Sequence, residues 1–211
     1  GRRGRPLPRP PERLPFSGNI MHQIDIINLA LTRMGQASVT SLTEGSAEAA
    51  AAAKVWDAAL RSTLQEFRWG FNTRRAALPL KAERPAGAAY AYAYGAPVDL
   101  VRPYEIFQED VTSDRPIPFL YEGGLIYTDQ PSAVLIYGGL EESAAAFPPQ
   151  FCDALAWRLA AELAGPLTQK TSLMEYAVNR YENGVARARA SAGNAQRPRD
   201  DRIPGYIRAR G

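Results

Sequence analysis

The sequence is poor in the residues from which disulfides, metal sites and catalytic centres are built. Cys152 is the only cysteine and His22 the only histidine among 211 residues. One cysteine excludes an intrachain disulfide, and one histidine with one cysteine falls short of the roughly four ligands of a structural zinc site. We therefore interpret Cys152 as an inert core thiol, and we predict no metal and no cofactor.

Long hydrophobic runs are also missing. No apolar stretch approaches the ~20 residues that a helix needs to cross a bilayer, so we expect no membrane partner. The first residues carry arginines without an apolar stretch after them, which does not fit a secretory signal. An apolar fraction of 45% and a charged fraction of 22% are nevertheless ordinary for a globular protein, so the chain can bury a core.

The motifs of common enzyme classes are absent as well. The sequence has no GxxxxGK[ST] phosphate loop, GxGxxG fingerprint, GxSxG elbow or HExxH helix. A Ser-His-Asp triad would have to use His22, at the start of the first predicted helix. The acidic pairs Glu109–Asp110 and Glu141–Glu142 fall at strand or link ends and are interpreted as solvated surface. We predict that the protein is not an enzyme.

Four segments repeat apolar residues at spacings of three and four, as amphipathic helices do. They cover about residues 22–34, 47–68, 149–164 and 173–190. Ser46 suits the N-cap of the second, and Ser172 with Glu175 matches a capping box for the fourth. Gly165–Pro166 is expected to end the third.

Between the second and third helices the pattern changes to period-two runs rich in glycine, proline and aromatic residues. Tyr90, Tyr92 and Tyr94 should share one face of a strand, where they either stack on nucleic-acid bases or, more commonly, pack on a neighbouring element. The segment Glu122-Gly123-Gly124 indicates a β-hairpin. We predict four to six antiparallel strands in a small sheet or open barrel.

The order of these elements predicts an α+β fold. A four-helix bundle forms from the N- and C-terminal halves, a small antiparallel β domain interrupts it, and extended arms lie at both ends. Met174 and Val178 are expected on the buried face of the last helix. The predicted boundaries are 1–20 for a Pro/Arg-rich arm, 21–70 plus 145–190 for the bundle, 71–144 for the β domain and 191–211 for a basic C-terminal tail.

The net charge of +3 is unevenly distributed. Residues 1–20 carry +4 and residues 191–211 carry +3, which leaves −4 for the residues between them. Basic arms suggest a partner, although two solvated tails are the simpler alternative. Apolar residues between the tail arginines favour docking in a groove of another protein over binding DNA. The predicted docking residues are Arg197, Arg199, Arg202, Ile203, Tyr206, Ile207 and Arg208.

A second group of predicted structural residues is the corner formed by Pro97, Asp99 and Arg102. A carboxylate three residues from an arginine in a proline-rich turn can accept hydrogen bonds from turn amides while the guanidinium pairs back with it. We predict that this corner is architectural rather than catalytic.

Several of these segments, taken in order, resemble the tail tubular protein A family, the head-to-tail adaptors of short-tailed bacteriophages. The likeness covers about residues 21 to 190. The matching segments are the opening helix Ile24–Gly35, the motif Phe67–Phe71, the Tyr-x-x-Pro-x-Asp-x-x-Arg corner from Tyr94 to Arg102, and the blocks Leu135–Tyr137, Phe147–Phe151, Leu155–Ala160 and Gly165–Thr168.

The resemblance implies a structural virion protein, an adaptor ring of about twelve subunits between the capsid portal and the tail nozzle. The implied partners are copies of the chain itself, the portal protein, a nozzle or tail tubular protein B-like protein, and viral DNA that passes through the channel without sequence-specific binding. The implied location is the tail at the portal vertex of the virion, with assembly in the cytoplasm of the host bacterium. The alternative is a basic-armed nucleic-acid-binding protein.

Overall fold

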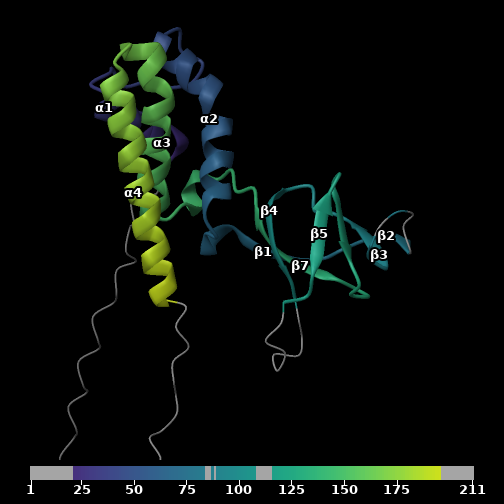
Figure 1. Cartoon of the computed structure of the whole chain (residues 1–211). Helices are drawn as coiled ribbons and strands as arrows, with labels where there is room; N and C mark the ends of the chain where they lie inside the picture. The colour runs from purple at the N-terminus through teal and green to yellow at the C-terminus, as the bar shows by residue number, and fades with distance from the viewer. Residues whose placement is uncertain (1–20, 84–86, 88, 108–115, 196–211) are drawn as a thin grey trace, which may run out of the picture.

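The computed structural model describes residues 21–83, 87, 89–107 and 116–195. It shows the predicted α+β architecture, with a helical body beside a smaller β body (Figure 1). The chain enters the β body after its second helix and returns to the helical body for its last two. Each body has a hydrophobic core of its own.

The helical body is organised around its third helix. The four helices are α1 (Gln23–Arg33), α2 (Ala47–Glu66), α3 (Pro149–Thr168) and α4 (Thr171–Ala195). Helix α3 contacts each of the other three, and in Figure 1 it stands between α2 and α4. Its sequence alternates alanine with large apolar residues, so neighbours approach it on most sides, and the side chains of Phe151, Leu155 and Leu159 are fully buried. Burial raises the pKa of the Cys152 thiol, consistent with an inert core residue.

The predicted first residues of the helices lie closer to the observed ones than the predicted last residues do. Ser46 caps α2 by accepting a hydrogen bond from the Ala49 amide at 3.2 Å, as predicted. The prediction that Gly165–Pro166 ends α3 was wrong, because the helix passes through Pro166 to Thr168. In this last turn the Thr168 hydroxyl donates to the Ala164 carbonyl at 2.7 Å.

Helix α4 differs from its prediction at both ends and on one face. It begins at Thr171, so Ser172 lies inside the helix and the predicted capping box is not its cap. It continues to Ala195, so residues 191–195 are helical rather than part of an extended tail. Met174 and Val178 are 38% and 40% exposed, because Ala177 lies closest to α3.

The β body contains seven described strands in two antiparallel sheets, which is more than predicted. One sheet has the order β1-β7-β4 and the other β2-β3-β6-β5. The strands of the first sheet are β1 (Thr73–Ala77), β7 (Val134–Gly139) and β4 (Leu100–Ile106), and those of the second are β2 (Leu80–Glu83), β3 (Tyr92–Gly95), β6 (Leu125–Thr128) and β5 (Phe119–Glu122). Strand β1 escaped prediction because its sequence, TRRAA, shows no alternation, and β2 because LKAE is only four residues long and is exposed throughout.

The predicted hairpin is confirmed. Strands β5 and β6 pair from Phe119↔Thr128 to Glu122↔Leu125. The two loop glycines, Gly123 and Gly124, have φ values of 57° and 78°. Positive φ at both positions is what a two-residue loop of this class requires, and glycine adopts it without steric cost.

Of the three tyrosines at positions 90, 92 and 94, Tyr94 packs inside the β body. The rings of Tyr92 and Tyr94 lie 6.1 Å apart. Tyr94 is 2% exposed and its hydroxyl donates to the Gln130 carbonyl at 2.9 Å. Tyr90 precedes the strand. The sequence allowed either base stacking or packing on a neighbouring element. For Tyr94 the packing alternative is confirmed.

Candidate interaction surfaces

A polar network lies on the β body where the chain enters and leaves it. The Tyr137 hydroxyl donates to Asp99 Oδ1 at 3.0 Å, and Arg74 pairs with Asp99 Oδ2. Arg74 also reaches Glu141 Oε2 at 3.2 Å. The Leu140 amide donates to the Asp99 carbonyl at 2.8 Å. Asp99 therefore holds the entry strand, the exit strand and the start of β4 together.

The electrostatics of this network are those of a structural junction. Burial raises the pKa of Tyr137, and the hydrogen bond to Asp99 raises it further, so the phenol remains a donor. Burial acts to lower the pKa of Arg74, but its hydrogen bond to Asp99 and the charges of Asp99 and Glu141 outweigh this effect, and the pKa is raised.

The predicted corner exists, but its side chains pair differently from the prediction. The Leu100 amide donates to the Pro97 carbonyl at 3.1 Å, which closes a turn. Asp99 does not pair with Arg102, whose Nη1 donates instead to the Gln65 carbonyl at 2.8 Å, near the end of α2. The reason is that β4 starts at Leu100, and extended backbone carries residues three apart about 10 Å away from each other. The interpretation of Glu141 as solvated surface was also wrong, since it pairs with Arg74.

Two adjacent glycines in β7 allow side chains to pack closely against it, and the second of them borders the network. A Cβ atom on Gly138 would lie 2.5 Å from the Tyr104 hydroxyl. A Cβ atom on Gly139 would lie 2.5 Å from Arg74 Cδ and 2.9 Å from Asp99 Oδ2. Any side chain on Gly139 would therefore displace the Arg74–Asp99 pair.

The residues predicted to dock on a partner cannot be placed. Arg197, Arg199, Arg202, Ile203, Tyr206, Ile207 and Arg208 lie outside the described residues, as do Glu109 and Asp110. Among the residues that the structure does describe, no three or more histidine, cysteine, aspartate and glutamate side chains gather as they would around a metal ion. None of the described helices is long and apolar enough to cross a membrane.

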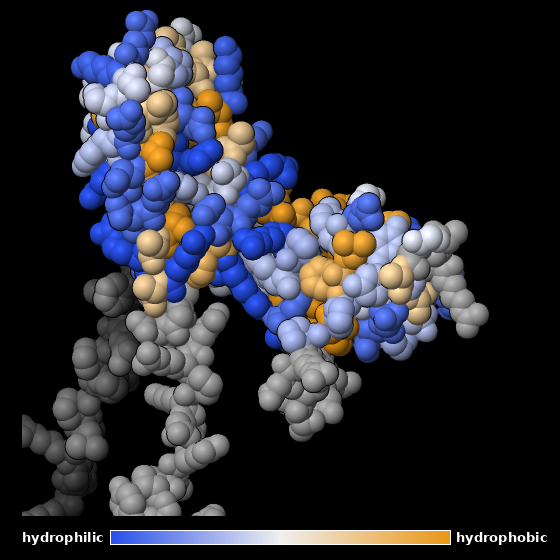
Figure 2. All heavy atoms as spheres, in the orientation of Figure 1, coloured by the Kyte–Doolittle hydropathy of each residue, from blue (hydrophilic) through white to orange (hydrophobic). Residues whose placement is uncertain are grey.

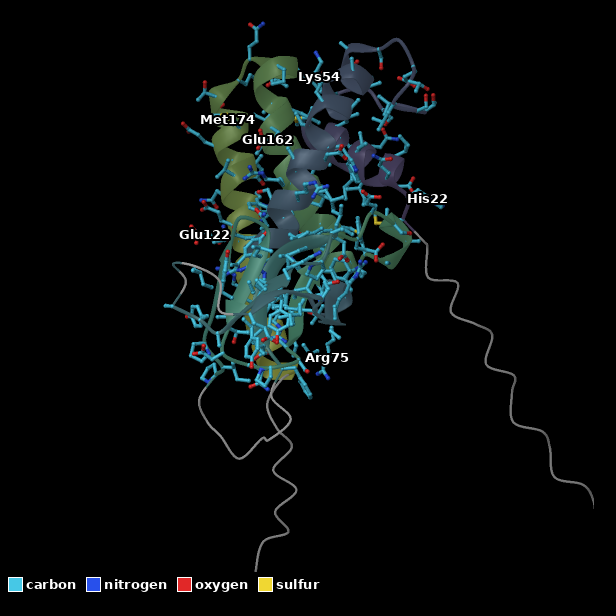
Figure 3. All side chains as sticks on the ribbon, turned by 90° about the vertical axis from the view of Figure 1, so that its right-hand side faces the viewer. His22, Lys54, Arg75, Glu122, Glu162 and Met174 are labelled. Atoms are coloured by element: carbon cyan, nitrogen blue, oxygen red, sulfur yellow. The ribbon has the colours of Figure 1, made fainter. Side chains whose placement is uncertain are left out.

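Both bodies expose large apolar side chains. On the helical body they project from α4, and on the β body from strands β2 and β5 and from the corner turn, so apolar colour interrupts the polar surface of each body in Figure 2. Val98, at the tip of the corner, is fully exposed, and Tyr176 is 55% exposed. In Figure 3, Met174 lies at the outer edge of α4, on the side of the bundle away from His22. The set is Leu80, Val98, Phe107, Leu120, Tyr121, Met174, Tyr176 and Val178.

No protein-family model matches the chain, and no curated protein matches it.

The sequence pointed to the corner around Asp99 but not to the side chains that join Asp99 in the network. Arg74 and Glu141 lie 25 and 42 residues from Asp99, and no local pattern links such distant positions. The adjacent glycines at 138–139 were the only available signal, because paired glycines in a buried strand indicate the close approach of another group.

Proposed function

We propose that the protein is a structural, non-enzymatic adaptor that assembles with copies of itself into a ring joining the capsid portal to the tail nozzle. The ring, of about twelve copies, would surround the DNA path. The observation that carries the proposal is the exposure of large apolar side chains on both bodies of one chain. The resemblance of residues 21 to 190 to tail tubular protein A adaptors supports the same assignment.

The exposed apolar side chains support assembly because their burial between chains removes them from water. A fully buried valine, leucine or methionine side chain contributes about 1.5–3 kcal/mol relative to an exposed one. Such residues on both the α4 side and the β side give one chain two separate contact regions. A ring requires two different contact surfaces on every copy, since each copy touches a neighbour on either side.

The junction supports the proposal by fixing how the two bodies are joined. Arg68 pairs with Glu105 at 3.0 Å, and Arg102 bonds to Gln65, so the end of α2 is tied to β4 at two further points. A defined angle between the bodies gives every copy the same shape, which a closed ring needs.

Electron microscopy of the purified full-length chain, with mass photometry in parallel, tests the proposal. We expect closed rings of uniform size. Val178→Asp should shift the population to single copies, because a carboxylate would be buried in the contact, whereas Glu182→Gln on the same helix should leave the rings intact. A chain that stays monomeric at all concentrations, without portal or with it, contradicts the proposal.

A truncation after Ala195 tests the predicted docking tail. It removes Gln196 to Gly211 but keeps the whole of α4. We expect this variant to form rings and to lose association with the portal protein in co-purification. Equal co-purification of the truncated and full chains would remove the tail from the docking mechanism.

A further inference from the structure

A groove between the start of α3 and the second half of α4 carries arginine side chains that the adaptor ring does not explain. Its volume is about 540 Å³. Pro149, Gln150 and Asp153 line it from α3, and Arg180, Gly184 and Arg187 line it from α4. A Cβ atom on Gly184 would meet nothing within 4 Å, so the α4 wall is open at that level.

Two arginine side chains near this groove, those of Arg33 and Arg180, rest on the ring of one tryptophan. The Cζ atom of Arg33 lies 4.1 Å from the centroid of the Trp157 ring, and that of Arg180 lies 5.2 Å from it. Trp157 is itself only 8% exposed, so its ring is a fixed support. Guanidinium groups resting on an aromatic face lose less rotational freedom when they bind a ligand.

The positive charge in the groove exceeds the negative charge. Arg33 pairs with the carboxylate of Asp153 and also donates to its carbonyl at 3.1 Å. Among the described residues, neither Arg180 nor Arg187 forms an ion pair. The Nε atom of Arg180 is buried and has no hydrogen-bond partner within the described part of the chain. Two cationic side chains, one of them half-buried, are therefore left without a compensating anion.

We propose that this groove binds a carboxylate-bearing segment of another protein chain, with Arg180 and Arg187 as the residues that recognise its carboxylates. The planar guanidinium suits two parallel hydrogen bonds to a carboxylate. Arginine is enriched among the residues that dominate the energy of protein interfaces. The inference goes beyond the proposed ring, because it concerns a groove within a single copy.

The shape of the groove favours a peptide over a nucleic acid. The Asp153 carboxylate, which also lines the groove, is already paired with Arg33 and does not separate the two ligand classes. Arg180 lies partly beneath the surface, where an extended peptide side chain reaches more readily than the backbone of a stiff duplex. Binding of DNA at these arginines is the competing outcome of the test.

Fluorescence anisotropy with two labelled probes tests the inference on the full-length chain at low ionic strength. The probes are a peptide of alternating glutamate and alanine and a DNA duplex. We expect saturable binding of the peptide and a loss of affinity of about tenfold or more in Arg187→Ala and in Arg180→Ala. Arg180→Lys keeps the charge but not the planar fork, so it should bind with intermediate affinity.

Matched variants make each outcome decisive. Arg61 is an exposed arginine on α2, so Arg61→Ala removes the same charge elsewhere and should leave peptide binding unchanged. Arg187 is exposed, so its substitution does not threaten the fold, and thermal melting checks this. The inference is overturned by absence of saturable peptide binding, by an equal loss in Arg61→Ala, or by DNA that binds at the same arginines and displaces the peptide. Ring formation is measured separately by mass photometry, so a monomer that binds the peptide would contradict only the proposed ring.

Discussion

The helical body and the β body are stabilised in different ways. The helical body has one large core in which α3 packs on its three neighbours. The core of the β body is much smaller, with Tyr94, Ile126 and Leu135 among its buried residues. The β body also relies on the polar network of Arg74, Asp99 and Tyr137 at its junction. Apolar burial thus dominates one body, whereas specific polar contacts matter more in the other.

This difference has a consequence for how each body tolerates change. A large core distributes the loss of one side chain over many neighbours but still leaves a cavity. A small core beside a polar junction depends on a few residues whose geometry must be kept. Substitutions in the two bodies should therefore differ in how much stability they cost and in how far through the molecule their effects spread.

The largest effect is expected from truncation at the centre of the helical core. Leu155 is fully buried on α3. Leu155→Ala should lower the free energy of unfolding by about 2–5 kcal/mol, because it removes buried methyl groups and leaves a cavity. Urea denaturation followed by circular dichroism measures the change. Ile126→Ala is the matched truncation in the β body, and hydrogen exchange should show its loss of protection mainly in β3, β5 and β6. Equal loss of protection in α3 would mean that the two bodies unfold as one unit.

The next largest effect is expected at the junction. Gly139→Ala should destabilise the protein by about 1–3 kcal/mol, because the added Cβ would overlap Arg74 and Asp99. Gly184→Ala is the control, since its Cβ has open space within a helix, and it should stabilise by up to about 1 kcal/mol. Thermal melting of both variants shows whether each substitution raises or lowers the stability of the protein. If Gly139→Ala melts no lower than the wild type, close packing at the junction is not needed.

The two bodies also differed in how far sequence alone could predict them. The helices were predictable because their signals are local, as the capping of α2 by Ser46 and the stripe of α3 show. The glycine pair of the β5–β6 hairpin was equally local. Strand β1 was not predictable, because its partner β7 lies some sixty residues away and its sequence, TRRAA, has no alternation.

The candidate site followed the same rule. Asp99 stood out because of its place in a proline-rich turn, but its true partners, Arg74 and Tyr137, come from other strands. The groove on α3 and α4 had no local signal, since Arg180 lies 23 residues from Trp157 and Arg33 lies 120 residues from Asp153. Chain topology, and not spacing, brings these side chains together.

A smaller effect is expected from the charge of Asp99. Asp99→Asn keeps the shape of the side chain but removes the negative charge that Arg74 pairs with. We expect a loss of about 1–2 kcal/mol, since both partners are partly exposed and water screens the pair. Chemical denaturation at low and high salt measures it, and high salt should reduce the difference from the wild type. An unchanged stability would show that the Tyr137 and backbone hydrogen bonds alone hold the corner.

The smallest effect is expected in the loop before α2, where a polar contact serves the helical body. Glu44 accepts hydrogen bonds from the Thr40 amide and hydroxyl, both at 2.7 Å, and from the Ser46 hydroxyl at 2.7 Å. These bonds, led by the one from the Thr40 side chain, lower the pKa of Glu44 from 4.5 to about 2. A carboxyl whose pKa is lowered on folding stabilises the native state above its unfolded pKa, and that stability disappears as the pH falls through the folded value. The melting temperature of the wild type should therefore approach that of Glu44→Gln between about pH 4.5 and pH 2. A difference between the two proteins that stays constant over this range would mean that the charge of Glu44 does not support the loop, and that even this polar contact of the helical body is dispensable.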